Sequence, residues 1–125
     1  MNQENNNQIF DISSEAFADL ARSWIEDRKG IRTKIIDVRG SASYADFFVI
    51  TSGGSERQVH AIAENIQYEA SKRGMTPKSV EGERTSRWIL LDYYDVIIHV
   101  FHEQDREFYD LERLWQDNLR PTAEQ

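Results

Sequence analysis

Histidines are the side chains of this chain best suited to binding a metal ion. The sequence contains His60, His99 and His102. His99 and His102 are three residues apart in an apolar stretch typical of a strand, where such residues point to opposite faces. No acidic residue has an obvious metal-ligand spacing with them in the sequence, so we predict no zinc site and no cofactor. For His99 two interpretations remain: a half-buried ring with satisfied hydrogen bonds or, as we prefer, a contact residue beside Trp88.

The loop Ser52-Gly53-Gly54-Ser55 precedes an expected helix and could hold an anion at the helix N-terminus. However, it lacks the Gly-Lys-Ser/Thr sequence of a P-loop and does not match a dinucleotide-binding fingerprint. Ser55 and Gln58 have the spacing of a capping box. We therefore interpret the loop as a helix cap.

A second loop, Gly40-Ser41, is followed by Asp46, Phe47 and Phe48. Nucleotidyltransferases place a Gly-Ser loop before two carboxylates on one strand face, and these hold the magnesium ions that activate the attacking hydroxyl. Here Phe48 occupies the position of the second acid. One carboxylate cannot build a two-metal site, so the scaffold is predicted to be related while the chemistry is absent. No Ser-His-Asp arrangement is indicated either, and we predict that the chain is not an enzyme.

The stretch from Arg87 to Phe101, which contains His99, is the segment around which we expect the rest of the fold to be arranged. It consists of two apolar segments joined by a polar turn at Asp92–Asp95. Placing Tyr93 and Tyr94 in a two-residue loop predicts a β-hairpin. The predicted pairs are Leu91–Val96, Leu90–Ile97, Ile89–Ile98 and Trp88–His99.

The two faces of this hairpin differ in composition because side chains alternate along a strand. The aliphatic face, expected to be core, carries Ile89, Leu91, Val96 and Ile98. The other face and its border carry the residues that we predict to bind a partner: Trp88, Leu90, Asp92, Asp95, Ile97, His99 and Phe101. Aromatic anchors beside a few polar groups are typical of a protein-binding patch. The alternative is that helices cover both faces.

Periodicity predicts the remaining elements. The expected helices span residues Ser14 to Lys29, Ser55 to Gly74 and Gln104 to Asn118, the last with a stripe of Phe108, Leu111, Leu114 and Trp115. The expected strands include Lys34–Arg39 and Asp46–Thr51, the latter central because its apolar run is unbroken. Residues Lys78 to Ser86 are expected to be a polar linker with a turn near Gly82. The predicted fold class is α/β: a single domain with a mixed four- to five-stranded sheet, three helices and nucleotidyltransferase-like topology.

Composition predicts one globular domain, with 39% hydrophobic and 30% charged residues among 125. Residues 1–10 are expected to be a disordered tail, 11–118 the folded domain, and 119–125 a flexible tail. The absence of cysteine, of a secretory signal and of a membrane-length apolar run predicts a cytoplasmic protein. A net charge of -7 argues against nucleic acid as the main ligand and favours a basic protein partner.

Three motifs carry a family resemblance. The central strand and helix contain Asp46-Phe47-Phe48-Val49-Ile50 with Thr51, Gly53, Ser55, Arg57, Val59 and Ala61-Ile62-Ala63. The hairpin contains Glu81-Gly82, Trp88-Ile89-Leu90-Leu91-Asp92 and Asp95-Val96-Ile97-Ile98-His99-Val100-Phe101. The last helix contains Arg106-Glu107-Phe108-Tyr109-Asp110-Leu111-Glu112-Arg113-Leu114-Trp115. Over roughly Ser14 to Trp115 the chain resembles the ribosomal silencing factor family, also called RsfS, Iojap or DUF143.

The resemblance implies a non-enzymatic function. Members of that family bind uL14, the large-subunit ribosomal protein numbered fourteen, and sterically block association of the ribosomal subunits. This represses translation under nutrient limitation. The resemblance also implies a homodimer when the protein is free, and a fold related to nucleotidyltransferases.

The chain departs from the family at Tyr94, where glycine is frequent in the turn, and at Arg87 and Gln58. A turn that needs a positive φ would be strained at Tyr94, and so would shift the hairpin register. Two alternative functions remain: a vestigial or altered nucleotidyltransferase-fold protein that binds nucleotide, and a plain dimerisation module that pairs through the face of Trp88.

Overall fold

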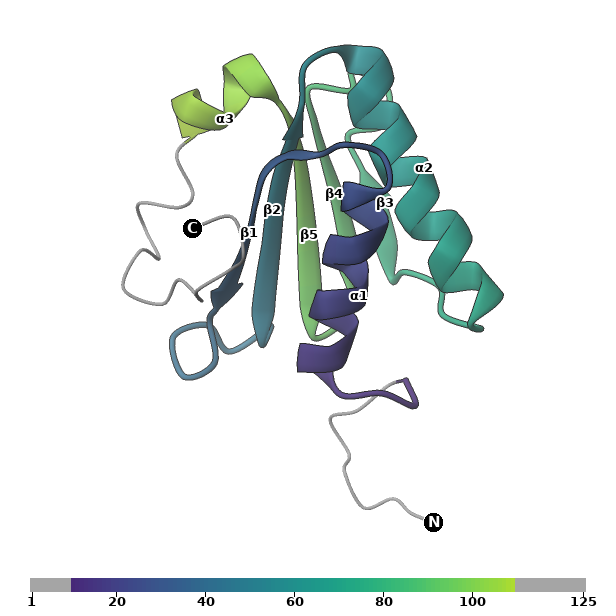
Figure 1. Cartoon of the computed structure of the whole chain (residues 1–125). Helices are drawn as coiled ribbons and strands as arrows, with labels where there is room; N and C mark the ends of the chain where they lie inside the picture. Colours follow the sequence, from purple (N-terminus) through teal and green to yellow (C-terminus); the bar gives the residue numbers. More distant parts are fainter. Residues whose placement is uncertain (1–9, 110–125) are drawn as a thin grey trace.

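The structure is a computed structural model that describes residues 10–109, in which three helices and five strands follow one another (Figure 1). The elements are α1 (Ser14–Glu26), β1 (Ile31–Asp37), β2 (Phe47–Gly53), α2 (Glu56–Lys72), β3 (Ser79–Glu81), β4 (Trp88–Tyr93), β5 (Val96–His102) and α3 (Glu103–Tyr109). The predicted α/β class with three helices and a mixed sheet is confirmed. The side chains of the stripe predicted at Phe108, Leu111, Leu114 and Trp115 lie outside the described residues, as do both predicted tails apart from Phe10.

The sheet has the strand order β1-β2-β5-β4-β3. β2 and β5 are parallel, and the other neighbouring pairs are antiparallel. Between these two strands the chain passes through α2 and then β3 and β4. Every residue of β2 is buried, which confirms the central position predicted from its apolar run.

Helices α1 and α2 lie together on one face of the sheet (Figure 1). α1 begins where Ser13 Oγ accepts a hydrogen bond from the Ala16 amide at 3.1 Å, as expected of a serine N-cap. Its apolar stripe faces the sheet, and Phe17 packs on Trp24 and on Tyr93 of β4, with ring centroids 5.9 and 5.0 Å apart. The aliphatic side of the hairpin completes this core with Ile89, Leu91, Val96 and Ile98.

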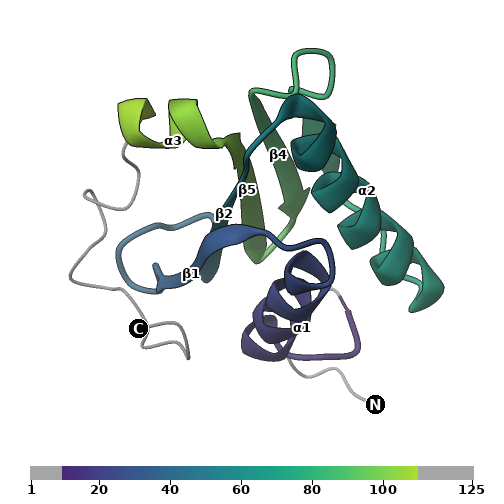
Figure 2. The same ribbon diagram turned by 45° about the horizontal axis from the view of Figure 1, so that its top comes forward.

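The opposite face of the sheet receives α3 at one end (Figure 2). Arg106 anchors that helix: its side chain is buried, and its guanidinium donates to the Ile31 carbonyl at 3.0 Å and to Ser52 Oγ at 2.9 Å. Because α1 and α2 both pack on the other side, the remainder of this face has no helix over it among residues 10–109.

The hairpin register differs from the predicted one by two residues. Tyr93 pairs with Val96 and Trp88 with Phe101, so the turn is Tyr94-Asp95 rather than Tyr93-Tyr94. Tyr94 adopts φ +73°, and its amide donates to Asp92 Oδ1 at 2.8 Å, which supports the unusual conformation. The ring of Tyr93 is buried against Phe17, and this burial favours keeping Tyr93 in the strand. A slip of two residues leaves each side chain on its predicted face.

The edge strands of the sheet are short or irregular. β3 falls within the segment predicted as a polar linker, and it has only three residues. At the other edge, the pairing of β1 with β2 shifts between Ile31 and Lys34, and Arg32 in between has φ +51°. β1 also begins three residues before the predicted start at Lys34.

Candidate functional site

The face opposite α1 and α2 carries a row of rings that crosses three strands. From the loop before β2, Tyr44 lies 6.2 Å from Phe48, and Phe48 lies 5.2 Å from His99 of β5. His99 is 6.0 Å from Trp88 of β4, and Trp88 stacks on Phe101 at 4.9 Å with the planes 28° apart. All these distances join ring centroids. We call the surface the aromatic face, and it comprises Tyr44, Phe48, Trp88, Leu90, Asp92, Ile97, His99 and Phe101.

Burial divides the residues predicted to contact a partner into two layers. Phe101, His99 and Ile97 are buried, with exposed fractions of 1%, 5% and 6%. Trp88, Leu90 and Asp92 on β4 remain half-buried, and so does Asp95 in the turn. β5 therefore forms the floor of the aromatic face, and the neighbouring β4 carries the accessible groups.

A hydrogen bond joins the two layers. The indole Nε1–H of Trp88 donates to Nδ1 of His99 at 3.2 Å. An indole nitrogen can only donate, so Nδ1 must be unprotonated and the neutral ring carries its proton on Nε2. Burial lowers the pKa of His99 to about 4, which favours the same neutral form. Nε2 is buried and has no hydrogen-bond partner among residues 10–109.

Acidic groups lie at the hairpin turn, on both sides of the sheet. Asp92 pairs with Ile97 on the aromatic face, whereas Asp95 lines a small hollow with Ser14 and Phe17 on the helix side. Burial, and secondarily the charge of Asp46, raises the pKa of Asp95. The amides of Asp46 and Phe47 donate to the Asp95 carbonyl at 2.7 and 3.2 Å, so the turn is fixed to the start of β2. Asp92 accepts the Tyr94 amide with one of its carboxylate oxygens. The structure therefore places Asp92 on the aromatic face, and it places the predicted contact residue Asp95 beside the N-terminus of α1.

Tyr44 and Phe48 were not among the predicted contact residues. Tyr44 is 64% exposed, and it is one of two large hydrophobic side chains that are strongly exposed among the described residues. Its position beside Phe48 depends on how the loop folds back over β2, which periodicity does not reveal. Tyr44 directly follows the small and polar residues Gly40 to Ser43, and this aromatic residue in a loop was the available signal.

The enzyme-like motifs take structural roles. Ser55 Oγ accepts the Gln58 amide at 3.1 Å, which confirms the predicted helix cap. Asp46 accepts a hydrogen bond from Ser14 Oγ at 2.7 Å, and so connects β2 to the start of α1. Phe48 is buried at the position of the second acid. Between residues 10 and 109, no cluster of three or more side chains is suited to hold a metal ion.

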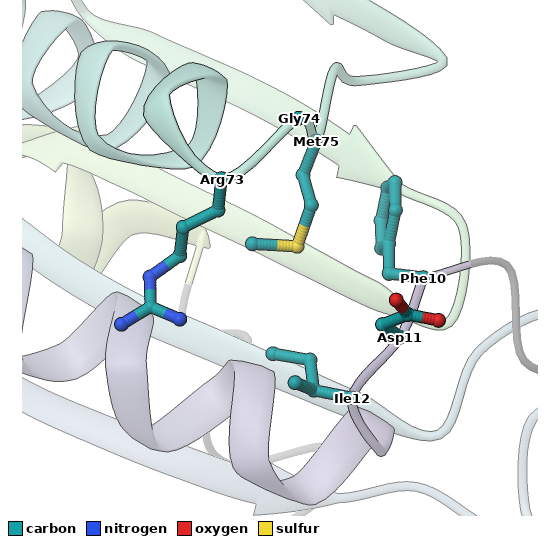
Figure 3. Close-up of a pocket in the computed structure, with 6 residues that line it drawn as sticks. All are labelled: Phe10, Asp11, Ile12, Arg73, Gly74 and Met75. Carbon is teal, nitrogen blue, oxygen red and sulfur yellow. The ribbon is translucent and has the colours of Figure 1, made fainter.

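A hollow of about 350 Å³ lies on the helix side of the sheet, between the segment before α1 and the turn after α2. Figure 3 shows Met75 reaching between Arg73 on one side and Phe10 on the other. Arg73 caps the C-terminus of α2, and Asp11 precedes the N-cap of α1. Each charge complements the dipole of its own helix, so neither requires a ligand. The aromatic face is the stronger candidate site.

None of the helices within residues 10–109 is both long and apolar enough to cross a membrane.

Comparison with known proteins relates this chain to one family. A family model described as "Ribosomal silencing factor during starvation" matches residues 11–125. The ribosomal silencing factor RsfS of Halalkalibacterium halodurans is 39% identical over 113 residues, which cover 90% of this chain and 95% of that protein.

Two further similarities extend this set. A crystal structure of a Chromobacterium violaceum protein superposes with a TM-score of 0.82 at 30% identity, covering 89% of this chain and 92% of that one. The mouse protein named "Mitochondrial assembly of ribosomal large subunit protein 1" is 34% identical over 84 residues, which cover 65% of this chain and 37% of that longer protein.

Proposed function

The chain belongs to the ribosomal silencing factor family, and from this premise we propose that it binds ribosomal protein uL14 on the large subunit and thereby blocks subunit association. The observation that carries the proposal is the aromatic face, where a half-buried Trp88 lies on a sheet surface that α1 and α2 leave uncovered. Repression would follow from occupancy alone, because a bound domain excludes the small subunit from the same surface. The family description names starvation, so we expect the protein to act when nutrients are limiting.

Apolar burial supplies the binding free energy in this proposal. Burying a large side chain contributes about 2 kcal/mol, and truncating a tryptophan anchor costs about 2–4 kcal/mol. Trp88 is suited to be that anchor because Phe101 supports its ring from below. Leu90 is its half-buried neighbour on the same face of β4.

Charge supplies orientation and speed of encounter. The net charge of -7, Asp92 on the aromatic face and Asp95 in the adjoining turn complement the basic surface that is usual for a ribosomal protein. Such complementarity raises the association rate and fixes the docking register more than it adds affinity. It also disfavours a primary contact with ribosomal RNA, whose phosphates would be repelled.

No catalytic step is needed in this mechanism. The second acid of a nucleotidyltransferase site is replaced by Phe48, and Asp46 is engaged by Ser14. We propose that the protein acts in the cytoplasm as a binding protein without cofactor. Magnesium-dependent nucleotide binding, measured by calorimetry, would argue for the nucleotidyltransferase alternative instead.

The test is co-sedimentation of purified protein with large ribosomal subunits. Trp88→Ala should weaken binding by about 30-fold or more, and it should restore subunit joining in a sucrose gradient. Tyr68→Ala is the matched control, since Tyr68 is 59% exposed on α2, in the helix layer on the other side of the sheet. A folded Trp88→Ala protein that pellets like the unchanged protein would refute the assignment of this face.

The free protein is also expected to pair through the aromatic face, because an uncovered apolar surface favours self-association. Light scattering on the unchanged protein and on Trp88→Ala tests this point. Loss of a dimer in the variant, without any change in binding to large subunits, would favour the plain dimerisation module.

A further inference from the structure

The Trp88–His99 hydrogen bond satisfies the indole before any partner arrives. Trp88 Nε1 lies 3.2 Å from His99 Nδ1, and the indole ring is half-buried. A tryptophan at a protein interface usually offers its N–H to an acceptor on the partner. Here that donor is used inside the chain, while the apolar part of the ring remains at the surface.

Two contacts together determine how Trp88 is held. The stack on Phe101, with ring planes 28° apart, limits the tilt of the indole. The hydrogen bond to His99 limits rotation of the ring within that plane. Trp88 pairs with Phe101 across the β4–β5 ladder, and His99 is its diagonal neighbour on the same face. A side chain constrained in this way loses little rotamer freedom on binding.

His99 is an unfavourable residue for a purely structural position. It is 5% exposed, and its Nε2–H is buried without an acceptor among residues 10–109. A buried donor without a partner destabilises the folded state, whereas an aliphatic residue of similar volume would pack at the same site without that penalty. The histidine is explained if its Nδ1 is required as an acceptor for Trp88.

We propose that His99 is a positioning residue that holds Trp88 in its binding orientation, and that the partner meets the indole with apolar groups rather than with a hydrogen-bond acceptor. This inference rests on the proposed function and changes the role predicted for His99 from partner contact to support. The partner groups that fit are aliphatic side chains and the methylene stems of basic residues, with the charged ends of those residues near Asp92 on the same face of β4.

Four variants test the proposal, with purified large ribosomal subunits as the binding probe. His99→Leu removes the acceptor and should weaken binding by about 3- to 10-fold, the effect expected from losing one ordered side chain. His99→Gln can restore an acceptor and should bind within about 3-fold of the unchanged protein. Trp88→Phe removes the donor, so adding His99→Leu to it should change binding by less than about 2-fold.

A second readout separates positioning from general stability. In a ¹⁵N spectrum, the indole N–H of Trp88 should exchange with solvent faster in His99→Leu than in the unchanged protein, and His99→Gln should restore its protection. The proposal would be overturned if His99→Leu lowered affinity equally in the unchanged protein and in the Trp88→Phe variant, or if His99→Leu alone left binding unchanged. If Trp88→Ala itself binds normally, the proposed function fails and not merely this inference.

Discussion

The two ends of β4 present aromatic residues to opposite faces of the sheet. Tyr93 points to the helix side, where it is 1% exposed, and its hydroxyl has no hydrogen-bond partner within residues 10–109. Trp88 points to the other side, where it is half-buried, yet its N–H has a partner in His99. Each face holds one buried polar atom without a partner in residues 10–109, Tyr93 Oη on the helix side and His99 Nε2 on the aromatic face, so the difference lies in the ring that remains accessible. The aromatic face keeps its exposed ring oriented, as a binding surface does.

The largest difference between the two faces should be in stability. Phe17 is buried among Phe10, Trp24 and Tyr93, so Phe17→Ala should lower the free energy of unfolding by about 3–5 kcal/mol. Leu90→Ala on the aromatic face, where the side chain is half-buried, should cost about 1 kcal/mol. Urea unfolding of both variants measures the contrast. Equal losses would mean that both faces are core.

The pH dependence of stability should report on His99. The pKa of His99 is about 4 in the folded chain against an ordinary value of 6.5, so between these values the unfolded chain binds a proton that the folded chain does not. The contribution of a neutral His99 to the free energy of unfolding is complete above pH 6.5. It is lost as the pH falls toward 4, by about 3 kcal/mol in total.

His99→Leu is the matched control for that measurement, because the raised pKa of Asp95 acts in the opposite direction in both proteins. Urea unfolding at several pH values between 7 and 4 should give a steeper decline for the unchanged protein than for His99→Leu. Parallel curves would contradict the burial of a neutral imidazole.

Acidic charge at the hairpin turn should affect the rate of binding more than acidic charge on α2. Asp95→Lys should slow association with large subunits by about 10-fold at low salt, and the difference should shrink as salt is added. Stopped-flow association rates at two salt concentrations measure this effect. Glu64→Lys, an exposed acid on α2 in the helix layer, is the control and should have little influence.

The smallest expected effect distinguishes two exposed tyrosines. Tyr44 extends the aromatic face, whereas Tyr68 lies on α2, and both are strongly exposed, at 64% and 59%. Either alanine variant should change stability by less than about 0.5 kcal/mol. Tyr44→Ala should weaken large-subunit binding by about 3-fold, and Tyr68→Ala should leave it unchanged. Equal affinities would confine the binding surface to β4 and the turn.

Alternation along the strands was enough to predict the two faces but not the register. The assignment of Ile89 and Leu91 to the core and of Trp88 and Leu90 to the opposite side is confirmed by the two apolar clusters. The predicted pairing was wrong by two residues, because Tyr93 was placed in the loop on the basis of its polar neighbours. Its burial against Phe17 of α1 is a long-range contact that local sequence does not reveal.

Short and irregular features were the least predictable from sequence. β3 contains only Ser79–Glu81, too few residues for an apolar period, and it exists through pairing with β4. The sequence predicted that His99 lies beside Trp88 but not the hydrogen bond between them, because that bond depends on the diagonal placement given by the observed register. The central position of β2 and the cap at Ser55 were predictable because each depends on a run of neighbouring residues.

The construction of the two sheet margins has a consequence for self-association. At one margin a three-residue strand offers too few free amides to template another chain, and at the other the backbone at Arg32 interrupts the ladder. Lateral addition of strands, the route by which many β-proteins polymerise, is thereby discouraged at both ends.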